Sequence, residues 1–207
     1  HGFGNETATT EFDMLSLHDA LPIYPAHMVS DEDFRKLIAV LRMAVPYTGI
    51  LLSTRENSNI RRQAFELGVS QISAGSRTNP GGYNKDEKEM SQEEQFSLGD
   101  HHPLMAVIKD MVAAKYIPSF CTGCYRLGRV GADFMDLAKV GAIKNHCLPN
   151  AIFTFAEYLH DFADSELLES GFRLIDQMIF EFPNRLLVKN IKDSLTKIKE
   201  GKRDIYF

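Results

Sequence analysis

The sequence predicts an α/β fold in its first part and an all-helical fold in its last part. From residue 30 to residue 76, helical and buried-strand patterns alternate, as expected for a parallel sheet with crossover helices. From residue 118 onward only helical patterns occur. Near the boundary, two of the three cysteines are separated by only two residues, a spacing found in many metal and redox sites.

The overall composition excludes several classes of protein. The 207 residues are 44% hydrophobic, which is enough to bury a core without disulfide bonds. The net charge of −5 leaves no electrostatic footprint for nucleic acid. The sequence shows no secretory leader and no apolar run long enough to span a bilayer, and three cysteines cannot all pair within one chain. We therefore expect a reduced, cytoplasmic protein that binds neither nucleic acid nor membrane.

The first 29 residues have no clear place in a fold. They show neither sustained helical nor alternating periodicity. Residues 15–23, LSLHDALPI, also resemble the translation of a sequencing adapter. We therefore expect residues 1–29 to be irregular and foreign to the fold.

Residues 30–117 are expected to form the α/β part. Ser30 is a suitable N-cap for the first helix, and Gly68 is a suitable residue to close the second. The expected elements are a helix over 30–46, a strand over 48–54, a helix over 58–68, a strand over 69–76 and a helix over 103–116. This order implies that the two strands are parallel.

Two strands cannot form a complete parallel sheet, because their outer edges and apolar faces need neighbours. The pattern is typical of the last βα units of a larger barrel. The sequence therefore predicts the last βα units of a larger barrel in residues 30–117, followed by an all-helical domain in residues 118–207. Within that domain, Pro149 and Pro183 are expected to separate helices.

The cysteines form a Cys-x2-Cys pair, Cys121 and Cys124, and a third thiol, Cys147, after 22 further residues. A turn containing Gly123 allows the first two sulfurs to point to the same side and to reach one metal or cluster. Cys147 is expected to complete a three-thiolate site from a second, extended loop.

The identity of the bound group depends on whether a fourth ligand exists. A structural zinc site would need one, and the candidates are His146 and the more remote His101 and His102. Neighbouring side chains of an extended segment point in opposite directions, so His146 and Cys147 are not expected to bind the same ion. Three thiolates without a fourth ligand suit an iron–sulfur cluster that has one open iron.

Nearby positive charges favour this interpretation. Arg126, Arg129 and Lys144 would offset the negative charge that thiolates and sulfides concentrate. From the spacing alone, a thioredoxin-like redox pair and three buried apolar cysteines remain alternatives.

Residues 117–151 closely resemble the cluster-binding region of the radical S-adenosylmethionine tyrosine lyases that mature FeFe-hydrogenase. In that family a Cys-x2-Cys-x22-Cys motif holds an auxiliary four-iron cluster, and the spacing in this chain is identical. Residues 47–76 are similar to the family's last barrel strands and residues 200–207 to its terminus, so the resemblance covers residues 30–207. The related thiamine-pathway tyrosine lyase, a 2-iminoacetate synthase, shares the STRE strand but lacks these three cysteines.

The resemblance implies that residues 30–117 are the C-terminal fragment of a (βα)8 TIM-type barrel and that residues 118–207 form an all-helical iron–sulfur cluster-binding domain. It also implies an enzyme that cleaves S-adenosylmethionine and splits tyrosine into p-cresol and dehydroglycine, from which CO and cyanide are made. An extra iron on the auxiliary 4Fe-4S cluster would collect these ligands for the hydrogenase active site. Cys121, Cys124 and Cys147 match the ligands of that cluster. Ser53 and Arg55 match residues that hold tyrosine, which agrees with their position at the carboxyl end of a strand.

The chain also departs from the family pattern, because it contains no Cys-x3-Cys-x2-Cys motif for the S-adenosylmethionine cluster. We therefore expect it to be inactive alone, with S-adenosylmethionine and a second 4Fe-4S cluster bound only by the full-length protein. The expected partners are tyrosine, as substrate of that protein, and other hydrogenase maturation proteins. The alternative functions are a thiamine-pathway 2-iminoacetate synthase, a non-catalytic zinc-binding helical module and a helical interaction domain.

Overall fold

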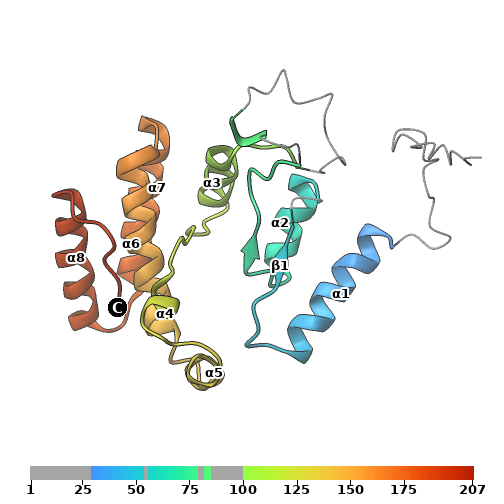
Figure 1. Cartoon of the computed structure of the whole chain (residues 1–207), viewed down its shortest axis with the longest axis horizontal. Coiled ribbons are helices and arrows are strands. Elements are labelled where there is room, and N and C mark those ends of the chain that lie inside the picture. The colour runs from blue at the N-terminus through green and yellow to red at the C-terminus, as the bar shows by residue number, and fades with distance from the viewer. Residues whose placement is uncertain (1–28, 54–55, 79–81, 85–99) are drawn as a thin grey trace, which may run out of the picture.

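The computed structural model describes residues 29–53, 56–78, 82–84 and 100–207. The α/β elements lie at one end of the molecule and the long helices at the other (Figure 1). The elements are α1 (Asp31–Ala44), β1 (Leu51–Leu52), α2 (Ser58–Glu66), β2 (Gln71–Ile72), the 3-10 turn η2 (Gly82–Asn84), α3 (Leu104–Ala113), α4 (Gly123–Arg126), α5 (Ala132–Lys139), α6 (Lys144–Phe162), α7 (Ser165–Glu181) and α8 (Arg185–Lys199). None of the described helices is both long and apolar enough to cross a membrane.

The helices of the first part begin and end where the sequence predicts. The Ser30 hydroxyl caps α1 by accepting the Asp33 N–H at 3.1 Å. Gly68, just beyond α2, has a φ of +107°, as expected for a glycine that closes a helix. A Cβ at this position would lie 2.8 Å from Nε of Arg42, so glycine also permits the contact between α1 and the end of α2.

The two strands are parallel, as predicted, with Leu51 opposite Gln71 and Leu52 opposite Ile72. Each strand is only two residues long, which is shorter than the sequence patterns suggested. The described part of the chain is therefore mostly helical, with little sheet. A small core beneath the strands consists of Ile38, Leu52, Ala64 and Val69.

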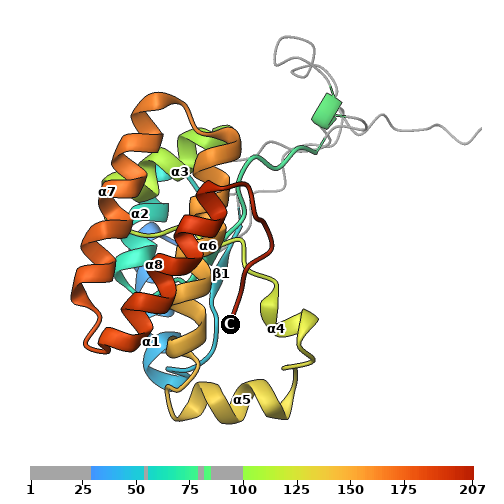
Figure 2. The same cartoon turned by 90° about the vertical axis from the view of Figure 1, so that its left-hand side faces the viewer.

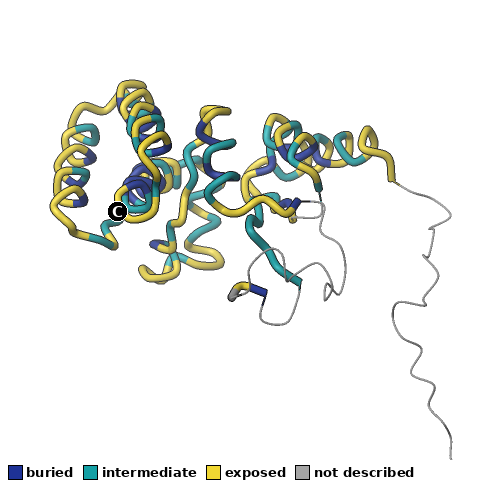
Figure 3. Tube along the Cα trace, turned by 90° about the horizontal axis from the view of Figure 1, so that it is seen from above, coloured by how far each residue is buried: buried dark blue, intermediate teal, exposed yellow. Residues whose placement is uncertain are grey.

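The second part is helical, as predicted, and α6 is at its centre, packed against α7 and α8. Its buried face carries Phe153 and Phe155, both with no exposed surface. In Figure 3 the buried positions of the long helices face one another. The larger core also includes Ile108 and Val112 of α3, so that helix packs with the helical part.

Gly171 sets the distance between α6 and α7. A Cβ at this position would lie 2.7 Å from both methyl carbons of Leu159 and 3.1 Å from Cζ of Phe155. Only glycine allows the two backbones to approach this closely without repacking the core.

The prediction that Pro149 separates two helices is wrong, because Pro149 lies inside α6. The helix begins with tight turns in which the N–H groups of Asn145 and His146 bond to carbonyls three residues back. Proline lacks an N–H group, but here the loss falls near the helix start and the ring is fully buried. The break predicted at Pro183 is confirmed, since α7 ends at Glu181 and α8 starts at Arg185.

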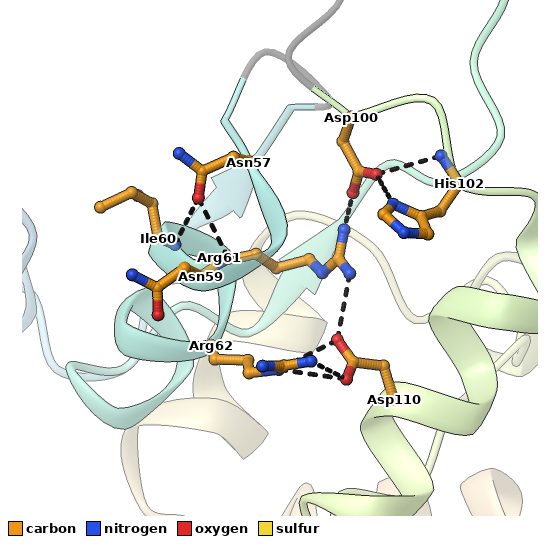
Figure 4. A network of polar contacts seen from close by, with 8 residues as sticks. All are labelled: Asn57, Asn59, Ile60, Arg61, Arg62, Asp100, His102 and Asp110. Atoms are coloured by element: carbon orange, nitrogen blue, oxygen red, sulfur yellow. Dashed lines mark hydrogen bonds and ion pairs between the residues drawn. The ribbon is translucent and has the colours of Figure 1, made fainter.

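A buried ion pair connects α2 to the segment before α3 (Figure 4). The Arg61 guanidinium bonds to Asp100, and the two side chains are each 4% exposed. Arg61 also reaches Asp110 of α3 at 3.1 Å, and Asp110 in turn accepts three hydrogen bonds from two nitrogens of Arg62. Burial acts to raise the pKa of Asp110, but the hydrogen bonds from Arg62 and Arg61 hold it below its ordinary value.

Breaking this pair from one side should destabilise the fold strongly. Arg61→Ala leaves the buried Asp100 carboxylate without its cation, which costs about 3–5 kcal/mol. Lys36→Ala, which removes an exposed pair with Glu32, should cost less than about 1 kcal/mol. Urea unfolding followed by circular dichroism measures both changes. The double variant Arg61→Met, Asp100→Leu should be more stable than Arg61→Ala, and equal losses for Arg61→Ala and Lys36→Ala would contradict this account.

Candidate metal centre

The Cys-x2-Cys pair lies at the short helix α4. Cys124 is within the helix and Cys121 just before it, and both are half-buried. The Gly123 N–H donates to Sγ of Cys121 at 3.3 Å, which closes the turn. A Cβ at residue 123 would lie 3.4 Å from that sulfur and from the side-chain nitrogen of Asn150. The cysteine turn is therefore in van der Waals contact with α6 at this position.

Two further contacts hold the cysteine segment on α6. The Phe120 N–H donates to Oγ1 of Thr154 at 3.1 Å. The Phe120 ring stacks on Tyr158, with the ring centroids 5.2 Å apart. The position of Cys121 is thus fixed by the helix that also carries the third cysteine.

Cys147 lies in the first turns of α6, so the prediction of an extended loop at this position is wrong. The Cys147 N–H bonds to the carbonyl of Ile143 at 2.9 Å, which makes this segment helical. Consecutive helical side chains are turned by about 100°, so His146 and Cys147 do not point in opposite directions. Cys147 is the exposed member of the three cysteines.

The three thiols are close enough to influence one another electrostatically. Although Cys147 is exposed as a residue, partial desolvation of its thiol raises its pKa. The negative charges of the Cys124 and Cys121 thiolates raise the pKa of Cys147 further, and the nearby Arg129 guanidinium opposes this increase. The fold therefore brings together three cysteines that lie on two separate elements.

Within the described residues, no three His, Cys, Asp or Glu side chains are arranged to hold a single metal ion. The thiolate ligands of one zinc ion each lie about 2.3 Å from the metal, so their sulfurs lie close to one another. Ligands of a four-iron cluster bind different irons and stand farther apart. The described residues lack the crowded arrangement that a single metal ion needs, and a four-iron cluster does not require it.

The C-terminal tail, residues 201–207, runs back along α6 and ends near α4 in both Figure 1 and Figure 2. Asn150, which is 1% exposed, accepts the Phe207 N–H at 2.8 Å and donates to the Phe207 carbonyl at 3.4 Å. Arg129 also donates to that carbonyl, at 2.7 Å. Closer to α8, Nε of Arg203 donates to Asp161 at 2.9 Å. The tail is therefore fixed to the same elements that carry the cysteines.

An open cavity of about 690 Å³ lies next to Cys121. One wall is the cysteine turn, a second is α6 and a third is the tail. Arg126 at its rim pairs with Asp204 at 3.2 Å and lies 5.9 Å from the centre of the Tyr206 ring. The cavity is lined by Leu104, Met105, Phe120, Cys121, Thr122, Gly123, Arg126, Thr154, Glu157, Tyr158, Asp161, Phe162, Asp204, Ile205 and Tyr206.

The surroundings fit an iron–sulfur cluster in three respects. The donor set consists of soft thiolates, which such clusters require. A main-chain N–H already points at a ligand sulfur, from Gly123 to Cys121. In addition, Nε of Arg129 is buried and has no hydrogen-bond partner within the protein. Cys121, Cys124 and Cys147 are the residues that would hold the cluster.

The other predicted site residues lie elsewhere or outside the described part. Ser53 directly follows β1, whereas Arg55 lies outside the described residues. His102 bonds to the buried Asp100 through Nδ1 at 2.6 Å. Of the predicted flanking cations, Arg129 lies close to the thiols, Arg126 lines the cavity and Lys144 is exposed on α6.

Sequence reasoning missed Asn150 and the part played by the tail. Asn150 follows Pro149 and precedes the apolar face of α6. A polar residue bordering such a face was the available signal, because a buried amide needs hydrogen-bond partners. The sequence did not indicate that these partners would be the main-chain groups of Phe207.

Comparisons with families and curated proteins give a consistent picture. Residues 12–117 match the model of the Biotin and Thiamin Synthesis associated domain. The chain is 35% identical over 78 residues to a 2-iminoacetate synthase of Salmonella typhimurium (strain LT2), covering 38% of this chain and 20% of that protein. It is 32% identical over 107 residues to the 2-iminoacetate synthase of Escherichia coli (strain K12), covering 52% of this chain and 28% of that protein.

Two solved structures are similar to the whole described fold. The first is HydG, a maturase of the [FeFe]-hydrogenase, with a TM-score of 0.81 and 44% identity, covering 88% of this chain and 39% of that one. The second is the FeFe-hydrogenase maturase HydG from Carboxydothermus hydrogenoformans, with a TM-score of 0.61 and 37% identity, covering 82% of this chain and 34% of that one. The chain thus spans between 20% and 39% of the length of these relatives.

Because the pKa of Cys147 is raised, its reaction with iodoacetamide should require a higher pH. Only the thiolate reacts, and a raised pKa keeps the thiol protonated to higher pH. The half-maximal rate at Cys147 is therefore expected at a higher pH in the folded, metal-free chain than in the same chain unfolded in urea. Peptide mass spectrometry measures the rate at this cysteine. An equal or lower midpoint in the folded chain would contradict the described surroundings.

Asn150→Ala should release the end of the tail. The variant loses both hydrogen bonds to Phe207, so hydrogen exchange at the Ile205, Tyr206 and Phe207 amides should become at least about tenfold faster. Asn145→Ala, which changes an exposed residue of the same helix, is the matched control and should leave these rates unchanged. Unchanged exchange in Asn150→Ala would show that Asn150 does not hold the tail.

Proposed function

Because the chain belongs to the radical S-adenosylmethionine protein family that has the Biotin and Thiamin Synthesis associated domain and includes 2-iminoacetate synthase and HydG, we propose that it is the C-terminal part of a hydrogenase-maturing tyrosine lyase. Its helical region binds the auxiliary 4Fe-4S cluster. Cys121, Cys124 and Cys147 are the ligands. The higher identity to HydG than to the 2-iminoacetate synthases supports the hydrogenase-maturing branch.

The observation that carries this proposal is the meeting of three thiols from two elements. Cys121 and Cys124 come from the turn over residues 121–126 (the α4 turn) and Cys147 from the start of α6, and the negative charges of the first two thiolates raise the pKa of Cys147. The same turn is fixed to α6 through Phe120 and Thr154. An open cavity beside Cys121 gives a small molecule access to the site.

The chain's own residues hold the site and limit the access of water to it. The tail forms one wall through its bonds to Asn150 and Arg129, and Gly123 brings the first thiol close to α6. When bound, the auxiliary cluster would supply an open iron that binds the small ligands made from tyrosine. S-adenosylmethionine cleavage belongs to the remainder of a longer protein, since this chain has no Cys-x3-Cys-x2-Cys motif.

The α/β elements are proposed to be the last βα units of a TIM-type barrel. Two parallel strands with open edges support this, because such strands need further neighbours. Ser53, directly after β1, and Arg55 would then stand at the carboxyl end of the barrel and bind tyrosine. A guanidinium suits the amino-acid carboxylate because it bonds to it through two nitrogens.

The thiamine-pathway reaction is the second candidate, favoured by the matches to two 2-iminoacetate synthases. That reaction does not need the three cysteines. Iron binding by these cysteines therefore separates the two candidates.

Anaerobic incubation of the 207-residue chain with iron and sulfide should yield about four irons per chain. Cys121→Ser, Cys124→Ser and Cys147→Ser should each lose most of this iron, because every variant removes one thiolate. Thr122→Ala changes a neighbouring residue whose side chain caps no helix, and should bind as much iron as the original chain. Metal analysis checks these amounts. One tightly bound zinc in place of iron, or full iron content in Cys147→Ser, would contradict the proposal.

A further inference from the structure

We propose that Arg129 is a positioning residue of the cluster site, whose Nε–H donates a hydrogen bond to a sulfur of the bound cluster or of its thiolates and makes the cluster easier to reduce. The inference rests on the proposed function. Arg129 contacts both the segment that carries Cys121 and Cys124 and the start of α6, which carries Cys147.

The main chain of Arg129 is bonded to the segment that carries Cys121 and Cys124. Its N–H bonds to the Cys124 carbonyl at 2.8 Å, which ends the α4 turn. Residues 128 and 131 are glycines with φ of +68° and +58°, a backbone conformation that glycine adopts without strain. The backbone of Arg129 thus has a fixed position relative to Cys124.

The side chain of Arg129 contacts the start of α6, which carries Cys147, and the C-terminal tail. One terminal nitrogen lies 3.5 Å from Nδ1 of His146, the residue before Cys147. The other donates to the Phe207 carbonyl at 2.7 Å. The guanidinium is therefore held at two corners by α6 and by the tail, which leaves its third donor group, Nε–H, in a defined orientation.

That third donor is buried and has no hydrogen-bond partner among the described residues. A buried charged group rarely leaves a donor unpaired, because desolvation without a hydrogen bond is costly. Among the described residues, Nε of Arg61 is also buried and unpaired, but Arg61 faces two carboxylates of the ion-pair network. Arg129 instead bonds to the Cys124 carbonyl through its main chain and is within electrostatic range of the Cys147 thiol.

A cation and an N–H donor at this position favour the reduced cluster. Reduction adds one electron, and the additional negative charge is stabilised by a positive group and by hydrogen bonds to sulfur. Arg126 is a suitable comparison. It is on the same turn and carries the same charge, but it pairs with Asp204 at the cavity rim and is 47% exposed.

The test measures the reduction potential of the reconstituted chain, with dithionite as the one-electron reductant and the EPR signal as readout. Arg129→Gln should make reduction about tenfold less favourable, which is a shift of about 59 mV to lower potential. Arg129→Lys retains the charge without Nε–H and should shift the potential less. Arg126→Gln removes the same charge and should shift the potential much less, because the Arg126 guanidinium is 47% exposed and pairs with Asp204. Equal shifts in Arg129→Gln and Arg126→Gln, or none in either, would overturn the proposal.

Two further outcomes are distinguished by measuring iron content and thermal unfolding of the metal-free chains. No iron in the unchanged chain means that the proposed function itself fails. If Arg129→Gln and Arg129→Lys fold normally but bind no iron, while Arg126→Gln binds it, the guanidinium is required at the site and the proposal stands. If both Arg129 variants are unfolded without metal, Arg129 is structural and the proposal is overturned.

Discussion

The structure depends on the burial of one face of α6. Phe153 and Phe155 on that face are completely buried, and α7 approaches closely because residue 171 is a glycine. The start of the same helix carries Cys147, and its polar edge holds the cysteine turn and the tail. The packing that stabilises the helical part therefore also determines where the thiols lie.

The proposed site would be assembled from segments that are distant in sequence. The α4 turn supplies two thiols, α6 the third, and the tail a wall of the neighbouring cavity. Arg129 contacts all three segments, through Cys124, His146 and Phe207. Loosening any one of these contacts would change the distances between the thiols, which a cluster tolerates poorly because its sulfur positions are fixed.

Local patterns predicted the helices and their caps well, because Ser30 and Gly68 act through near neighbours in the chain. The cysteine spacing predicted a three-thiolate site, and that assignment stays a prediction. Pro149 misled the prediction, since tertiary burial outweighs the break that proline normally makes. The bonds of Asn150 and Arg129 to Phe207 span 57 and 78 residues, and no local pattern encodes contacts over such separations. The assignment of Arg55 to tyrosine stays a prediction, as that residue lies outside the described ranges.

The central claim is that one iron–sulfur cluster joins the α4 turn to α6. The most direct measurement is anomalous diffraction at the iron absorption edge from crystals of the reconstituted chain. The account predicts one compact group of iron peaks, within bonding distance of the sulfurs of Cys121, Cys124 and Cys147. Anomalous signal at the zinc edge instead, or iron bound to Cys121 and Cys124 with Cys147 remote from it, would contradict the claim.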